Sequence, residues 1–121
     1  MENLYKVFEA IRKSNLEARK MNNYDKLLEN AQALSDYIPE MIEILVTQEN
    51  LYRKYEAELA NKKDENGKYY SNSYCETQAK ATEHYKEFKK AELTLDWSYA
   101  TINISKKLAA SVGNEYNSTI K

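Results

Sequence analysis

The chain has 121 residues, with 18 Lys and Arg against 19 Asp and Glu, and a formal net charge of −1 at pH 7. This length is typical of one domain, and the balanced charge argues against a general polyanion binder, which normally carries a basic surplus. One cysteine and one histidine exclude a disulfide framework and a two-histidine metal site within one chain, and two glycines leave no phosphate-binding glycine loop.

Helices are expected nearly everywhere, because the sequence holds only two Gly and one Pro and has no alternating apolar stretches. The first helix is expected over residues 3–20, where apolar residues recur at three- and four-residue steps. Asn22 and Asn23 predict the break that follows. A shorter helix is expected over residues 24–36, ending at Pro39 because the residue before a proline is pushed out of the helical region.

A third helix is expected to begin at Pro39 and to reach Asn61, since proline suits the first turn of a helix. The polar segment after it carries an Asn-Gly pair and predicts a loop at which the chain reverses (residues 61–68). Ser73 and Glu76 have the spacing of a capping box, in which the two side chains bond backbone amides at a helix start. The capping box therefore predicts the beginning of a fourth helix.

This fourth helix is expected over residues 74–112, up to a C-cap at Gly113-Asn114. It would be about 58 Å long, whereas a compact monomer of this size is about 35 Å across. At 100° per residue it has two apolar stripes on opposite sides, with small residues on the flank between them. One stripe consists of Leu93, Trp97, Ala100, Ile104 and Leu108, and the other of Phe88, Leu95, Tyr99, Ile102 and Ala109.

A helix that is apolar on opposite faces must be covered on both. Three helices of the same chain could enclose it, but the excess length favours self-association through the stripe of Leu93, Trp97, Ala100, Ile104 and Leu108. We therefore predict an all-α fold in a single domain over residues 1–121, with two N-terminal helices (1–38), a long antiparallel helical hairpin (39–112) and a frayed tail (113–121). The chain is expected to form an oligomeric helical bundle, at least a dimer.

No catalytic residue, metal ligand or cofactor is expected. His84 and Glu87 share a helix face, but the order of a di-iron motif is reversed and occurs once. Cys75 falls in the first turn of the fourth helix, yet no second histidine is present to act as its base. His84 is expected to be an exposed histidine in a charged helical stretch and Cys75 a buried or inert thiol. The protein is not expected to be an enzyme.

Tyrosine is in excess, with eleven copies against two Phe and one Trp. Most tyrosines lie on helical stripes and are expected in the core or an interface. A ligand site for a phosphate-bearing molecule with a stacked base is expected where the Asn-Gly loop meets the fourth helix, at Lys68, Tyr69, Tyr70 and Tyr74. The alternative is that these rings seal the end of the hairpin. Interleaved acids make Lys86, Lys89 and Lys90 a salt-bridged face.

The segments from Lys89 to Trp97 and from Ile102 to Leu108, after a polar hairpin loop with a glycine, are similar to small helical proteins from phage early regions. The resemblance covers roughly the C-terminal half. It rests on the general residue pattern and not on an invariant motif, so it transfers no functional residue. Such proteins are often encoded near recombination genes, or act as inhibitors and sponges against host defence. The resemblance implies a mobile-element origin and action by binding.

We therefore expect a non-catalytic oligomeric binding protein, phage-encoded, that blocks or sequesters a host component: a defence protein or a small nucleotide signal. The alternative is an accessory protein for single-stranded DNA recombination or replication, although nucleic acid is not the expected partner. Glu2 and Glu9 interrupt the apolar residues at the start, which does not resemble a signal peptide, and no apolar run reaches membrane-spanning length. A cytoplasmic protein without a membrane partner is expected, in the host cell if the chain is viral.

Overall fold

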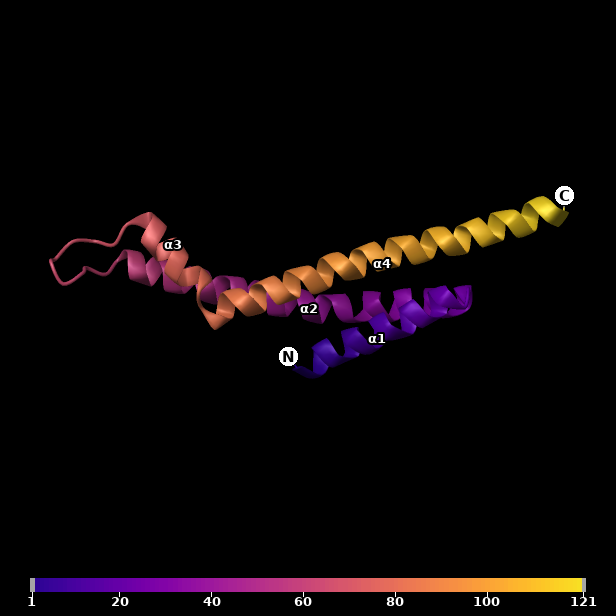
Figure 1. The fold of residues 1–121 in the computed structure, drawn as a ribbon, viewed down its shortest axis with the longest axis horizontal. Helices are drawn as coiled ribbons and strands as arrows, with labels where there is room; N and C mark the ends of the chain where they lie inside the picture. Colours follow the sequence, from indigo (N-terminus) through magenta and orange to yellow (C-terminus); the bar gives the residue numbers. More distant parts are fainter. Residues whose placement is uncertain (1, 121) are drawn as a thin grey trace. The chain divides into compact units, whose positions relative to one another are not determined.

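The computed structural model describes the backbone of residues 2–120 and the side chains of residues 2–111. Within this range the chain forms four α-helices and no named strand, so the predicted all-α class is confirmed. The helices are α1 (Glu2–Lys20), α2 (Tyr24–Ala60), α3 (Asn72–Lys80) and α4 (Glu83–Ile120), as Figure 1 shows.

The chain divides into two compact units. The three-helix unit contains α1, the part of α2 up to Met41, and α4 from Thr94 onward. The hairpin unit runs from Ile42 to Leu93 and contains the rest of α2, the loop, α3 and the start of α4. The division into two compact units does not test the expectation of a single domain, which stays a prediction.

The break between α1 and α2 lies where the two asparagines predict it. Asn22 adopts the left-handed conformation, with φ of 53°, which asparagine tolerates better than most residues. The Asn23 amide donates to the carbonyl oxygen of Ala18 at 2.8 Å, and the Asn23 side chain accepts from the Lys26 amide at 3.1 Å. One asparagine therefore ends α1 and the other caps α2.

The predicted boundary at Pro39 is wrong, because α2 continues through this residue and replaces the two helices expected over 24–36 and 39–61. A proline inside a helix costs about 3 kcal/mol. Here the ring is exposed, while Ile38 and Met41 beside it are buried on the inner face of the helix. Burial of these apolar side chains offsets the local cost, since packing contributes more to helix stability than propensity does.

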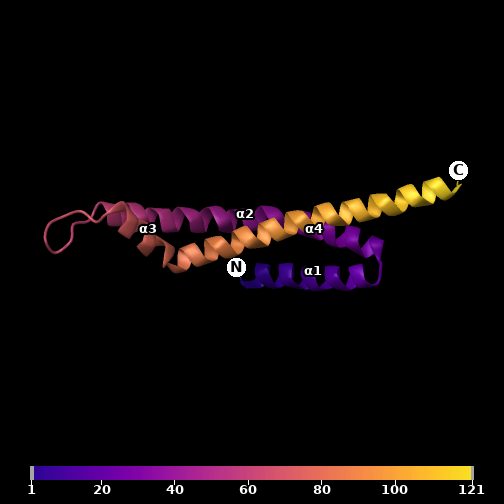
Figure 2. The ribbon, with the colours of Figure 1, turned by 45° about the horizontal axis from the view of Figure 1, so that its top comes forward.

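The core of the three-helix unit is mainly apolar near α1 and α2, where Asn15 and Asn30 are the buried polar residues, and contains small polar residues on α4. Figure 2 shows α1 beside the first part of α2, and the Asn30 amide nitrogen donates to the Ser14 hydroxyl at 3.2 Å between them. Ser98, Thr101 and Ser105 form the buried face of α4 with Leu95 and Ile102. The flank of small residues expected between two stripes is therefore the face that packs inward.

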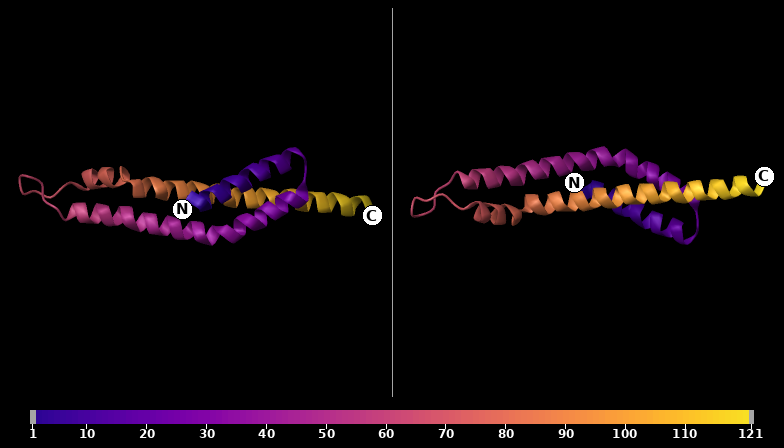
Figure 3. Two further views of the ribbon diagram at one scale, coloured as in Figure 1. Left: turned by 90° about the horizontal axis from the view of Figure 1, so that it is seen from below. Right: turned by 90° about the horizontal axis from the view of Figure 1, so that it is seen from above.

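In the hairpin unit the chain returns alongside α2 as two helical segments, α3 and the first part of α4, instead of one rod, as Figure 3 shows. The helix expected over residues 74–112 is interrupted, because α3 ends at Lys80 and α4 begins at Glu83. The Thr82 hydroxyl donates to the Ala79 carbonyl at 2.7 Å and accepts from the Tyr85 amide at 3.3 Å. A threonine before an acidic first turn is an ordinary N-cap signal, and it explains the break.

The predicted helix boundaries at Ser73 and Gly113 are also wrong. Ser71, in an extended conformation, caps α3, and its hydroxyl accepts from the Tyr74 amide at 3.1 Å. Ser73 lies inside α3, so its hydroxyl is not at the capping position. The backbone of α4 continues through Gly113 and Asn114 to Ile120, since a single helical glycine costs only about 1 kcal/mol. The expected tail thus begins within α4, and Lys121 lies outside the described residues.

Candidate functional site

The loop between α2 and α3 is held by one aspartate. The Asp64 carboxylate accepts hydrogen bonds from the amides of Asn66 at 2.8 Å and Lys68 at 2.9 Å. The Asp64 amide donates to the Lys68 carbonyl at 2.7 Å. Gly67 has a φ of 76°, a conformation that glycine adopts at no steric cost. The Asn-Gly pair therefore forms the expected turn, and the turn is built on Asp64.

The structure brings together only part of the expected ligand site. The rings of Tyr70 and Tyr74 are stacked, with centroids 4.8 Å apart and planes 19° apart. Tyr69 is 64% exposed, and its ring receives the Lys63 ammonium at 5.3 Å from its centroid. The Lys68 ammonium forms no hydrogen bond or ion pair with a described residue. The site thus contains the stacked rings of Tyr70 and Tyr74. Tyr69 is separate from them, and its ring contacts Lys63 and not the expected Lys68.

The Tyr74 amide is not available for a phosphate, because the Ser71 cap occupies it. The next amide, of Cys75, donates to the Ser71 carbonyl at 3.1 Å. A phosphate at this helix start would have to replace the cap. The described geometry favours ring contacts over phosphate binding here.

The expected interface stripe on α4 is left partly uncovered by its own chain. In the three-helix unit, Trp97 and Leu108 are half-buried, Ala100 is exposed and Ile104 is 42% exposed. Leu93, in the hairpin unit, is 67% exposed. Of the opposite stripe, Leu95 and Ile102 are buried whereas Tyr99 is exposed. Part of one apolar stripe lies in the core, and the other borders solvent.

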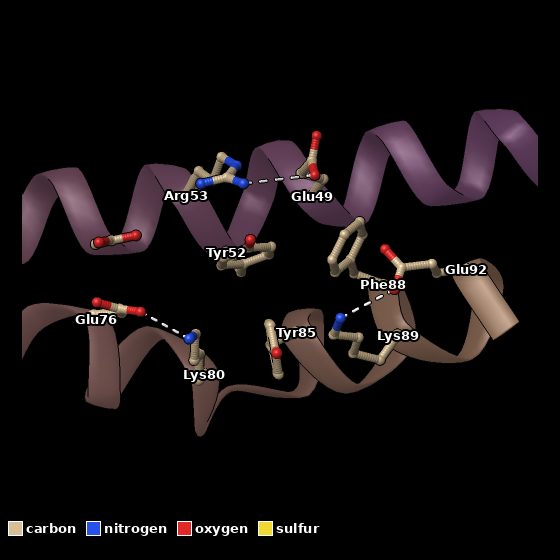
Figure 4. A pocket seen from close by; sticks show the side chains of 10 residues that line it. Glu49, Tyr52, Arg53, Glu76, Lys80, Tyr85, Phe88, Lys89 and Glu92 are labelled. Carbon is tan, nitrogen blue, oxygen red and sulfur yellow. Dashed lines mark hydrogen bonds and ion pairs between the residues drawn. The ribbon is translucent and has the colours of Figure 1, made fainter.

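The hairpin unit also contains a groove of about 590 Å³ between α2 on one side and α3 and α4 on the other. Figure 4 shows its aromatic side chains between charged ones. The residues that line it are Glu49, Tyr52, Arg53, Glu56, Glu76, Lys80, Tyr85, Phe88, Lys89 and Glu92.

Three rings that contact one another form the aromatic part of this groove. The centroid of Tyr52 lies 5.1 Å from that of Tyr85 and 5.3 Å from that of Phe88. Tyr52 and Phe88 are buried, with Ala79 in the same cluster. These edge-to-face and tilted contacts are favoured between aromatic rings, so the rings are held in fixed positions.

Ion pairs within single helices border the groove. Lys80 pairs with Glu76 at 2.7 Å, Lys89 with Glu92 at 3.0 Å and Arg53 with Glu49 at 3.7 Å. The hydrogen bond from Lys80 lowers the pKa of the Glu76 carboxyl below its ordinary value. The hydrogen bond to Glu92, with a smaller contribution from Tyr85, raises the pKa of the Lys89 ammonium.

The groove could not be predicted because it depends on the break at Thr82, which separates Glu76 and Lys80 from the rest of the expected rod. The expectation of a salt-bridged face is confirmed at Lys86 with Glu83 and at Lys89 with Glu92. The aromatic residues Tyr52 and Tyr85 were expected on helical stripes. The capping signal at Thr82 was not used in predicting the helices, and it would have divided the expected rod into α3 and α4.

The described residues contain no group of three or more His, Cys, Asp and Glu that could hold a metal ion. The Nδ1 atom of His84 lies 2.9 Å from the side-chain oxygen of Gln48. Cys75 is buried. Among the helices as described, none has the length and apolarity needed to cross a membrane.

Comparison with protein-family models, with curated proteins and with solved structures finds no match to this chain.

Proposed function

We propose that this protein is a non-catalytic binding protein that self-associates through α4 and sequesters a host component. The observation that carries the proposal is the exposed apolar stripe of the three-helix unit, where Trp97, Ile104 and Leu108 border solvent. Apolar side chains aligned on one helix face are commonly covered by a partner. A second copy is the partner we propose, since two-fold assemblies are the commonest.

The packing of the adjacent face of α4 supports this assignment. Ser98 and Ser105 are fully buried, and their small side chains let α4 approach its neighbours closely. Trp97, Ile104 and Leu108 lie on a different face of the helix, where their own unit covers them only in part. Their burial is gained only when another surface covers them.

The loop provides the proposed contact with the target. Asp64 fixes the turn through its hydrogen bonds, so the exposed ring of Tyr69 is presented at low entropic cost. Tyrosine on a rigid support is a frequent anchor of protein interfaces. A host protein is the target that this geometry favours, and a small nucleotide held by the Tyr70 and Tyr74 rings is the second form of the same proposal.

The phage origin and the action against a host are proposals that rest on the resemblance of the C-terminal half. The accessory role in DNA recombination is less favoured, because Lys80, Lys86 and Lys89 each pair with a glutamate one turn away. The glutamates balance these cations locally, so this part of the surface has no basic surplus for a nucleic-acid backbone.

Self-association is tested by light scattering during gel filtration. We expect a mass of at least twice 14.2 kDa for the wild type, and a lower mass for Ile104→Glu. Asn103→Glu is the matched control, since Asn103 is exposed on another face of the same turn and should leave the mass unchanged. A monomeric wild type would contradict the proposal.

Target capture is tested separately, with tagged protein in a lysate of an infected bacterium. Tyr69→Ala is expected to lose the captured component while the mass in light scattering stays the same. Tyr55→Ala, which removes an exposed ring from α2, is expected to retain it. Equal capture by both variants would remove the loop from the proposal.

A further inference from the structure

The groove of the hairpin unit carries more carboxylates than cations. Its lining includes four glutamates and three cations: Glu49, Glu56, Glu76, Glu92, Arg53, Lys80 and Lys89. Each cation forms an ion pair with a glutamate of its own helix. Glu56 is left without an ion pair among the described residues. The groove therefore has one unneutralised carboxylate.

The chain's own side chains show that the rings of this groove attract cations. The Arg53 guanidinium carbon lies 5.1 Å from the Tyr52 centroid. The Lys89 ammonium lies 5.8 Å from the centroid of Tyr85 and 5.6 Å from that of Phe88. These distances are typical of cation–π attraction. A ligand cation that replaces Lys89 would be attracted to the Tyr85 ring in the same way.

The carboxylates are distributed along the groove and not gathered at one point. Glu49 and Glu56 are seven residues apart on one face of α2, which separates them by about 10 Å along the helix axis. On the other side, Figure 4 shows Glu76 and Glu92 toward opposite ends, with Tyr52 and Tyr85 between them. The arrangement fits a linear molecule with a positive charge at each end and an apolar chain between.

We propose that this groove binds a small linear polyamine, with its terminal ammonium groups at the two glutamate-bearing ends and the chain between them against the partly buried ring of Tyr85. The ion pairs that border the groove are at the surface, and exposed pairs of this kind contribute little to stability. Glu76 and Glu92 can therefore exchange Lys80 and Lys89 for a ligand ammonium at small cost.

The electrostatics of the groove support a charged amine. The pKa of Lys80 is raised by its hydrogen bond to the Glu76 carboxylate. The same carboxylate would favour the protonated form of a bound ammonium. Added salt is expected to weaken binding, because the site is open to solvent.

The test is a titration of spermidine into the isotope-labelled full chain, followed by amide chemical shifts. Saturable shifts around Tyr52 and Tyr85 are expected, with weaker binding of butylamine, which has one ammonium. Glu56→Gln is expected to weaken spermidine binding about fivefold, the effect of losing one charged contact. Glu58→Gln is the matched control, since Glu58 pairs with Lys54 at 4.0 Å and does not line the groove.

Three results would overturn the proposal: no saturable shift with spermidine, butylamine binding as tight as spermidine, or equal weakening by the two glutamine variants. The outcome does not depend on the oligomeric state or on the Tyr69 loop, so it separates this inference from the proposed function.

Discussion

Replacing Ser98 with leucine is expected to destabilise the three-helix unit, because Ser98 is fully buried on the close-packed face of α4. The Ser98 hydroxyl donates to the Thr94 carbonyl of its own helix at 2.7 Å. Removing the hydroxyl therefore breaks no hydrogen bond to another helix. The cost comes from the added volume. Overpacking of this kind typically costs about 1–3 kcal/mol.

The measurement is thermal and denaturant unfolding at one fixed protein concentration. A loss of this size lowers Tm by roughly 4–12 °C in a chain of this length. Tyr99→Leu is the matched control, since the next residue is exposed, and its effect should stay within about 0.5 kcal/mol. Unchanged or raised stability of Ser98→Leu would refute the inward placement of the small residues, and with it the outward placement of Trp97 and Ile104.

Three further predictions concern single groups. Asn15→Leu should stabilise the protein by about 1 kcal/mol in denaturant unfolding, because the buried Asn15 side-chain oxygen has no hydrogen-bond partner among the described residues; a loss of stability would contradict this. Thr82→Ala should cost about 1 kcal/mol through the lost cap of α4, whereas Thr82→Ser should retain most of it. Glu76 should titrate by carboxyl NMR below 4.5, so its stabilising contribution is lost as pH falls through this lowered folded-state pKa; Lys80→Met should move the midpoint up toward 4.5, and an unmoved midpoint would exclude the pair.

The sequence predicts the helical class and one break well, because both depend on local chemistry. Few glycines and prolines leave the helix as the default, and Asn22 and Asn23 act within their own turn. Pro39 was misleading for the opposite reason. Its local preference is overridden by the burial of Ile38 and Met41, and single-sequence reasoning has no measure of that packing.

The candidate sites depend on the breaks more than on the residue types. Ser71 and Thr82 define α3 as a separate short helix, and this places Glu76 and Lys80 in one groove with Tyr85 and Lys89. In one continuous helix, the same side chains would point in other directions relative to one another. Composition could identify the excess of tyrosine, but not which rings would meet.

The two opposite stripes of α4 also show where periodicity reaches its limit. Periodicity identified both apolar stripes and the flank of small residues between them, but it ranked the faces by hydrophobicity and so did not place that flank inward. Close approach of helices depends on side-chain volume as well as on apolar character, and Ser98 and Ser105 permit that approach. The stripe that contains Trp97 and Ile104 is then covered only in part by its own unit. The proposed self-association and the internal packing therefore involve the same helix, and a variant that enlarges the small face should disturb the core before it disturbs any assembly through the outer stripe.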